Sequence, residues 1–136
     1  MIYITRKEHF NAAHKLFNPA WSEEQNNAIF GKCANKNWHG HNYELFVTVK
    51  GEINPDTGFV INLKDLSTLI KIGVTEILDH KNLNIDVKGM PIMPSTENVA
   101  IFIWNILDPK IKEMGAALHG IKLYETDSNY VEYFGE

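Results

Sequence analysis

The sequence has little of what would crosslink, anchor or strongly charge a protein. It has a single cysteine, Cys33, which excludes an intramolecular disulfide framework. Its longest mainly apolar stretch, residues 98–107, is far shorter than the roughly 20 residues that a membrane-spanning helix needs. Its net charge of −4 indicates no basic surface for nucleic acid or an anionic membrane. No charged and apolar leader is visible before the first predicted strand, so we expect a cytoplasmic protein.

What the sequence does contain is typical of one globular domain spanning residues 1–136. The apolar content of 44% is enough for a substantial core. Alternating apolar residues predict strands over residues 2–13, 39–50, 117–125 and 130–134, with a short extended piece over 59–61. Helical spacing of Leu63, Leu66, Ile70, Val74 and Ile77 predicts a helix that ends near Leu78, and a second helix is predicted over 94–107. A capping box beginning at Ser22 predicts a short helix over 22–30.

The resulting order, β-β-α-α-β-β, indicates an α+β fold. Short connections favour a four-stranded antiparallel sheet with both helices on one face. The edges of such a sheet expose unpaired backbone groups. We therefore expect these edges to need a partner.

The clearest chemical signal is His39-Gly40-His41 at the start of the second strand. Side chains two residues apart on a strand share a face, so both imidazoles point to one side of the sheet. His14 lies where the first strand ends, which in an antiparallel pair is next to the start of the second. Three neutral imidazoles with a fourth position open are the pattern of a catalytic zinc site.

Ordinary histidines of the core or surface remain the alternative interpretation. Imidazole also suits copper, iron and nickel, so the residues alone do not select zinc. His9 and His119 lack such partners and are interpreted as structural.

Five other residues are candidates for chemistry, and all but Glu125 have a simpler alternative. Cys33 lies on a polar loop near the histidines, where a thiol can act as a base or nucleophile, or else be an inert buried thiol. Asp79 can orient the imidazole of His80, although the pair also fits a polar turn after a helix. Glu97 is a candidate at the start of the second helix, although acidic residues are in any case favoured at helix N-termini. Glu125 continues the inward run His119, Ile121, Leu123, and a carboxylate there needs a partner such as a planar amidine-like group.

Six segments together resemble the 6-pyruvoyl-tetrahydropterin synthase family nearly end to end. In chain order they are Phe10-Asn11-Ala12-Ala13-His14, Phe30-Gly31-Lys32-Cys33, His39-Gly40-His41-Asn42-Tyr43, Leu78-Asp79-His80-Lys81-Asn82-Leu83, Ser95-Thr96-Glu97-Asn98-Val99-Ala100 and Tyr124-Glu125-Thr126. The resemblance implies the tunnelling fold (T-fold), in which three subunits close one barrel and two rings stack as a homohexamer. It also implies a zinc-dependent lyase that acts on 7,8-dihydroneopterin triphosphate, a small-molecule pterin substrate.

The same resemblance implies a role for each matched residue. The zinc ligands would be His14, His39 and His41. The catalytic base would be Cys33, and Asp79 with His80 would relay protons. The pterin ring would be anchored by Glu125, with help from Thr96 and Glu97, which a neighbouring subunit would supply.

Two other functions compete with 6-pyruvoyl-tetrahydropterin synthesis, the tetrahydrobiopterin-type reaction. A close branch, 6-carboxytetrahydropterin synthase of queuosine biosynthesis, shares the fold, zinc and substrate but releases acetaldehyde. Its cysteine typically stands four residues before the first histidine, whereas Cys33 stands six before His39, which favours the pyruvoyl branch. A non-catalytic pterin- or purine-binding metal module is the more distant alternative. The residues that hold the triphosphate are not identified by any motif, although Lys15, Lys32 and Lys36 lie near the site in sequence.

Overall fold

Two long antiparallel strands form the centre of the computed structural model, which describes all 136 residues. Strand β1 (Ile2–His14) pairs with β2 (His39–Gly51) along its whole length, from Ile2 opposite Gly51 to His14 opposite His39. Strand β4 (Ala117–Thr126) pairs with β2, and β5 (Asn129–Tyr133) returns beside β4 as a hairpin. A two-residue strand, β3 (Lys81–Asn82), lies parallel to the end of β1 and completes the order β3-β1-β2-β4-β5.

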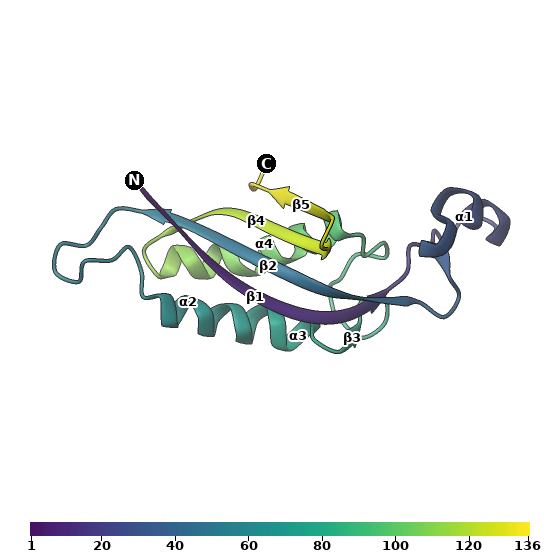
Figure 1. The fold of residues 1–136 in the computed structure, drawn as a ribbon, viewed down its shortest axis with the longest axis horizontal. Coiled ribbons are helices and arrows are strands. Elements are labelled where there is room, and N and C mark those ends of the chain that lie inside the picture. Colours follow the sequence, from purple (N-terminus) through teal and green to yellow (C-terminus); the bar gives the residue numbers. More distant parts are fainter.

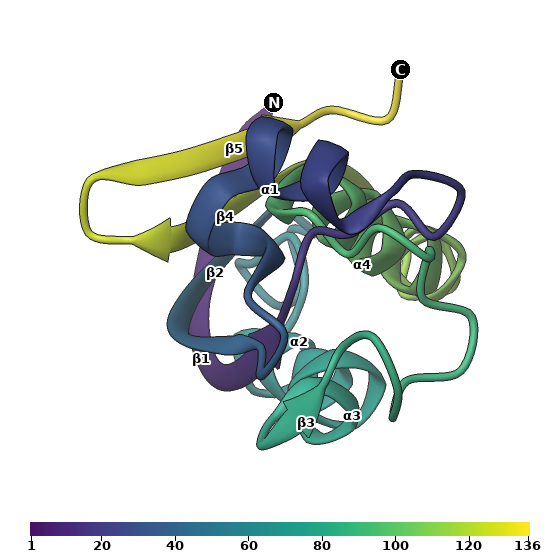
Figure 2. The same ribbon diagram turned by 90° about the vertical axis from the view of Figure 1, so that its right-hand side faces the viewer.

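The main helices cover one face of this sheet (Figures 1 and 2). They are α2 (Leu63–Ile70), which continues through a π-helical turn (Lys71–Thr75) into α3 (Glu76–Leu78), and α4 (Thr96–Glu113). Helix α1 (Glu23–Phe30) and a 3₁₀ turn (Gly31–Ala34) project beyond the end of β1 and β2 instead. None of these helices combines the length and the apolar character that crossing a bilayer requires.

The core lies between the sheet and the helices because one side chain in two on each strand points there. On β2 the fully buried positions are Tyr43, Leu45, Val47 and Val49, as the alternation predicts. They meet fully buried Leu66, Ile70, Val74, Ile103 and Leu107 from the helices. Burial of each such side chain contributes about 1.5–3 kcal/mol, so this layer supplies much of the driving force for folding.

The α+β class and the helix arrangement are confirmed, and the sheet has one more strand than the four expected. The extra strand β3 has two residues, too few for an alternation of apolar and polar residues to show in the sequence. It forms because the segment after α3 lies beside the end of β1, where Lys81 and Asn82 pair with Ala12 and Ala13. Residues 59–61, predicted as a short extended piece, form a bend and pair with no strand.

The helix predicted to end near Leu78 has an irregular last part. Its π-helical turn inserts one extra residue into the helical repeat. As a result Leu78 is fully buried and Ile77 is 41% exposed, so the prediction that Ile77 faces the core was wrong. A constant helical period does not hold across a π turn, which has more residues per turn than an α-helix.

Helix α4 continues past the predicted end at Leu107 to Glu113, with Pro109 inside it. The fixed φ of proline is compatible with a helix, and only one backbone hydrogen bond is lost. Burial of Ile111, which is fully buried, compensates for that loss.

A bulge in β4 changes which of its residues face the core. Leu118 pairs with Val49 and Gly120 with Thr48, which leaves His119 as the extra residue. His119 therefore does not belong to the inward run with Ile121 and Leu123; its ring contacts Tyr3 and Phe134.

Candidate metal centre and substrate cavity

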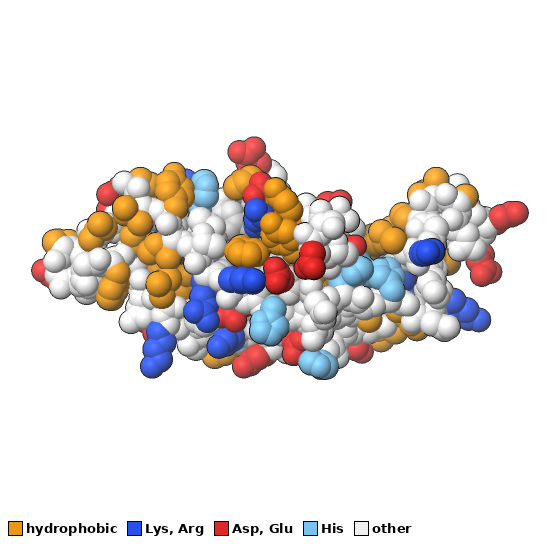
Figure 3. Space-filling model, viewed as in Figure 1, with side chains coloured by type: hydrophobic (Ala, Val, Ile, Leu, Met, Phe, Trp, Pro, Cys, Tyr) orange, Lys and Arg blue, Asp and Glu red, His pale blue; other side chains and the backbone are white.

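Three histidines converge where β1 ends and β2 begins. His14 is directly opposite His39, and His41 lies two residues further along β2 on the same face. One potential ligand atom from each ring lies within 4.8 Å of the other two. The space-filling view shows histidine side chains gathered on the surface between the sheet and α1 (Figure 3). The sequence-predicted convergence is thus present in the structure.

His14 is oriented by contacts from outside the cluster. Its Nδ1 lies 2.7 Å from the carbonyl oxygen of Pro94, just before α4. That nitrogen therefore carries the proton and donates, which leaves the lone pair of Nε2 for the cluster. The hydroxyl of Tyr43 lies 3.4 Å from the same Nδ1. Burial, and secondarily the charge of Glu125, raises the pKa of Tyr43, so this hydroxyl stays protonated.

The local environment keeps all three rings neutral near pH 7. Burial is the main reason that the pKa of His14 is lowered, and the hydrogen bond to Pro94 partly opposes it. Burial also lowers the pKa of His39, reinforced by the charge of His14. The pKa of His41 is lowered by burial, against the opposing effect of Glu125. A neutral imidazole has the free lone pair that a metal ion requires.

Unsatisfied nitrogens test whether a metal ion fits these residues. His39 Nδ1 and His41 Nε2 are buried and make no hydrogen bond, and the nearest carboxylate oxygen to His41 Nε2, Oε1 of Glu125, lies 3.5 Å away. A buried polar atom left unpaired costs about 1–3 kcal/mol, so such atoms normally have a bound partner. The cluster is therefore suited to a divalent cation that accepts nitrogen ligands, and no fourth side chain belongs to it.

Cys33 lies in the same cavity as two of these histidines. A cavity of about 520 Å³ is lined by Lys32, Cys33, Asn35, His39, His41 and Glu125. The thiol is half-buried, and the backbone N–H of Leu16 donates to the Cys33 carbonyl at 2.7 Å, which ties the 3₁₀ turn to the end of β1. Helix α1 starts with Ser22 accepting from the Gln25 N–H at 3.1 Å, as the capping signal predicts. The loop is thus an ordered support for the cysteine.

Glu125 connects this cavity to a second one. Its Oε1 lies 3.5 Å from His41 Nε2 and its Oε2 lies 4.0 Å from His14 Nε2. The hydroxyl of Thr96 donates to Oε2, from the first turn of α4. Glu125, Thr96 and Glu97 together line a cavity of about 300 Å³ next to β5. The three predicted substrate-binding residues are therefore brought together within one chain, and the expectation that a neighbouring subunit supplies Thr96 and Glu97 beside Glu125 was wrong.

Asp79 and His80 form the expected pair but lie elsewhere on the surface. Asp79 Oδ2 accepts from His80 Nδ1 at 2.8 Å, and Asp79 Oδ1 accepts from the Asn11 N–H at 2.8 Å. The hydrogen bond from Asn11, then that from His80, lowers the pKa of Asp79. The side chain of His80 is 77% exposed, and neither residue lines the cavity of Cys33. Within one chain, the structure does not bring this pair to the metal centre.

The sequence and fold were then compared with known proteins. The sequence model for 6-pyruvoyl tetrahydropterin synthase matches residues 3–136. The chain belongs to the 6-pyruvoyl tetrahydropterin synthase family. It is similar to the human protein named 6-pyruvoyl tetrahydrobiopterin synthase, with 46% identity over 98% of this chain and 91% of that protein.

Two further comparisons extend this result. The solved structure of Caenorhabditis elegans 6-pyruvoyl tetrahydropterin synthase is similar in fold, with a TM-score of 0.91 and 34% identity over 99% of this chain and 96% of that one. A Haemophilus influenzae protein named 6-carboxy-5,6,7,8-tetrahydropterin synthase is 26% identical over 98% of this chain and 99% of that protein. The chain has the T-fold of its family relatives.

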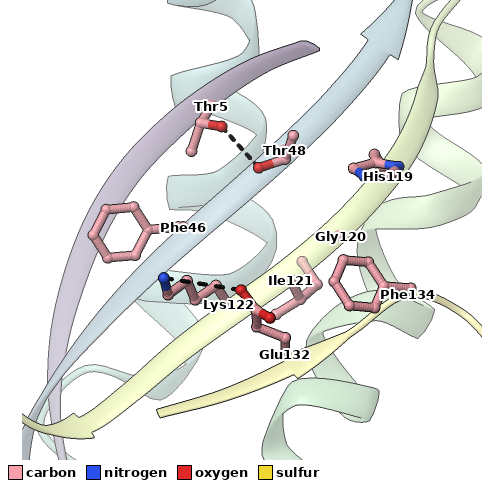
Figure 4. A pocket seen from close by; sticks show the side chains of 9 residues that line it. All are labelled: Thr5, Phe46, Thr48, His119, Gly120, Ile121, Lys122, Glu132 and Phe134. Carbon is pink, nitrogen blue, oxygen red and sulfur yellow. Dashed lines mark hydrogen bonds and ion pairs between the residues drawn. The ribbon is translucent and has the colours of Figure 1, made fainter. Parts of the chain in front are cut away.

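One further cavity of this family member lies on the sheet face opposite the helices (Figure 4). It has a volume of about 260 Å³, and Lys122 and Glu132 form an ion pair of 3.8 Å across it. Thr5 and Thr48 share a hydrogen bond of 2.7 Å at its other side. It contains none of the predicted site residues, and its charged groups are already paired.

Sequence reasoning did not identify two parts of the metal centre. The carbonyl of Pro94 has no side-chain signal, because any residue presents a carbonyl. Tyr43 lies on the same strand face as His39 and His41, so its period-two position could have indicated its place beside His14.

Proposed function

We propose that this protein is a zinc-dependent lyase that converts 7,8-dihydroneopterin triphosphate to 6-pyruvoyl-tetrahydropterin and triphosphate. The observation that carries the proposal is a cluster of three histidines, two of which have an unpaired buried nitrogen and line one cavity with Cys33. Membership of the family and 46% identity to the human synthase support the same reaction.

Metal binding is assigned to His14, His39 and His41. A zinc ion held there supplies Lewis-acid polarisation of the substrate side chain, which makes the adjacent C–H more acidic. The neutral rings and the hydrogen bond from His14 to Pro94 favour binding at pH 7.

Cys33 is assigned as the base that removes the proton. The proton moves to sulfur, the electron pair of the C–H bond forms a new C=C bond, and the C–O bond to triphosphate breaks. Proton redistribution then gives the pyruvoyl product, because oxidation of the side chain balances reduction of the ring. No external redox cofactor is needed.

Glu125 is assigned as the anchor of the pterin ring. A carboxylate accepts two parallel N–H bonds from an amino-pyrimidine edge. The hydroxyl of Thr96 donates to one of its oxygens and limits its rotation. Glu97, exposed on the rim of the adjacent cavity, is assigned a supporting role.

The proton relay of Asp79 and His80 is assigned to the site of another copy of the chain. The pair is preformed and exposed but lies outside the cavity of its own Cys33. Much of β1 also has no strand on its outer edge, since β3 pairs only with Ala12 and Ala13. Both observations favour an oligomer, and the hexamer of two stacked trimers that the family resemblance implies is the assembly we assign.

Product analysis tests the reaction. Zinc-loaded protein is incubated with dihydroneopterin triphosphate, and we expect triphosphate and 6-pyruvoyl-tetrahydropterin by mass spectrometry. Acetaldehyde with a carboxypterin would assign the protein to the 6-carboxytetrahydropterin branch instead. Binding of pterin without turnover would support the non-catalytic module.

A further inference from the structure

We propose that a cavity beside the histidine cluster binds the triphosphate chain of the substrate through the ammonium groups of Lys15 and Lys36, with Lys32 in the adjoining Cys33 cavity. This inference rests on the proposed function, because the triphosphate belongs to that substrate. The cavity has a volume of about 300 Å³, and the residues on which the argument depends are Lys15, Phe17, Glu23, Asn27, Asn35 and Lys36. We refer to it as the lysine cavity.

The lysine cavity adjoins the cavity of Cys33. Asn35 lines both, and Lys32 and Lys36 stand on either side of it along the chain. The 3₁₀ turn Gly31–Ala34 therefore lies between the two cavities. The thiol of Cys33 faces one of them, and the end of the turn borders the lysine cavity. A substrate whose reacting carbon lies near Cys33 can extend its side chain past Asn35 into the lysine cavity.

Lys15 is held next to the metal centre by its backbone. It follows His14 directly, and the cross-strand pair of His14 with His39 puts Lys15 beside Trp38. Asn84 accepts from the Lys15 N–H at 2.8 Å and donates to the Lys15 carbonyl at 3.1 Å. The position of this residue is thus fixed by two hydrogen bonds that leave its side chain free.

Two aromatic rings hold the Lys15 ammonium group at the lysine cavity. Its Nζ lies 4.5 Å from the ring centre of Trp38 and 5.3 Å from that of Phe17. Trp38 has a φ of 62°, a left-handed conformation that bulky residues rarely adopt and that concentrates at functional sites. This strained backbone directly precedes His39, so it positions the aromatic ring and a metal-ligand candidate together.

The charges of these lysines are not neutralised within the chain. None of the ammonium groups of Lys15, Lys32 and Lys36 has a carboxylate within 4.0 Å, whereas Lys7 and Lys112 each have one. A protein of net charge −4 thus concentrates unpaired positive charge beside its metal centre. A chain of phosphates carries several negative charges and is the ligand that such a group attracts.

The amides of Asn27 and Asn35 add neutral donors, and the carboxylate of Glu23 is the one acidic group of the lysine cavity. Glu23 opposes anion binding. Replacing Glu23 by a neutral residue should therefore strengthen anion binding, whereas replacing a lysine should weaken it.

The test is calorimetric titration of the full-length protein with inorganic tripolyphosphate. Lys15→Met retains the side-chain stem over Trp38, and Lys36→Met removes a charge from an exposed position. We expect each to weaken tripolyphosphate binding about tenfold, and Glu23→Gln to strengthen it about threefold. The matched control, Lys64→Met, changes an exposed and unpaired lysine on α2 and leaves binding within about twofold.

Two further measurements make the result specific. Binding of dihydroneopterin, which lacks phosphate, should stay within about twofold of wild type in every variant. Because tripolyphosphate also chelates zinc, the titration is repeated without added metal, and the losses must appear in both series. If Lys15→Met also loses dihydroneopterin, the exposed changes Lys36→Met and Glu23→Gln decide the question.

Unchanged tripolyphosphate affinity in the lysine variants would overturn this inference, as would wild-type protein that does not bind tripolyphosphate at millimolar concentration. Either result leaves the proposed reaction intact if the wild type still releases triphosphate. Conversely, normal tripolyphosphate binding without turnover would refute the reaction and keep the anion site.

Discussion

Acidification of the metal-free protein from about pH 7.5 to 5 should lower its free energy of unfolding through the histidine cluster. The pKa values of His14, His39 and His41 all lie below the ordinary value of 6.5 in the folded protein, mainly because of burial. As the pH falls below 6.5, the unfolded chain binds protons that the folded chain does not. Stability present above 6.5 is therefore lost as the pH falls towards the folded pKa values.

The size of the effect follows from the number of buried rings. One histidine contributes at most about 1.4 kcal/mol per pH unit, so three contribute at most about 4 kcal/mol per pH unit. The partial exposure of His39 and His41 makes the real slope smaller, whereas the side chain of His14 is only 2% exposed. A domain of this size is stable by about 5–15 kcal/mol, so the loss is large enough to measure.

The assay is urea unfolding with a chelator present, followed by tryptophan fluorescence at a series of pH values. His14→Asn keeps a donor for the Pro94 carbonyl and should reduce the slope by up to about 1.4 kcal/mol per pH unit. The control His9→Asn changes an exposed histidine and should leave the slope unchanged. A wild-type stability that does not fall between pH 6.5 and 5, or a His14→Asn slope equal to that of wild type, would refute the reasoning.

Three further predictions concern the site and the core. Cys33→Ala should lower kcat by about 10²–10⁴-fold with pterin affinity nearly unchanged, by steady-state kinetics and titration; full turnover would remove its assignment as base. Glu125→Gln should weaken dihydroneopterin binding by about 10–100-fold and Thr96→Val by less, by calorimetry, because a charge-assisted bond is lost; equal affinities would exclude Glu125 as anchor. Leu78→Ala should reduce the free energy of unfolding, measured in urea, by about 2–5 kcal/mol, because Leu78 is fully buried. The matched variant Ile77→Ala should reduce it by under about 1 kcal/mol, because Ile77 is exposed. Similar losses in the two variants would contradict the change of helix face that the π turn causes.

Much of the histidine cluster was predictable because strands have a short and rigid period. The alternation on β2 places His39 and His41 on one face, and antiparallel pairing brings His14 beside them. The Cys33 cavity was predictable only in part. Its loop position was readable, but its closeness to the histidines depends on the hydrogen bond between Leu16 and Cys33, which links residues far apart in the chain.

The errors of prediction share a cause as well. The exposed Ile77 and the bulge at His119 are both places where one inserted residue breaks a regular repeat, whereas α4 continues through Pro109, a residue that normally ends a helix. A constant period of 3.6 or 2 residues has no means of anticipating one inserted residue. Strand β3 was missed for a related reason, because its two residues pair only where the chain happens to return to β1.

The sequence by itself determined the α+β class, the three imidazoles at one strand junction and the motifs that resemble one enzyme family. These properties depend on side-chain chemistry and on neighbours within one or two strands, which a periodic pattern encodes. Only the tertiary structure decided that Lys15 and Lys36 line one cavity next to that of Cys33, that the Pro94 carbonyl orients His14, and that Asp79 and His80 lie away from their own cysteine. Such relations join residues distant in the chain, and their distances depend on how the whole core packs.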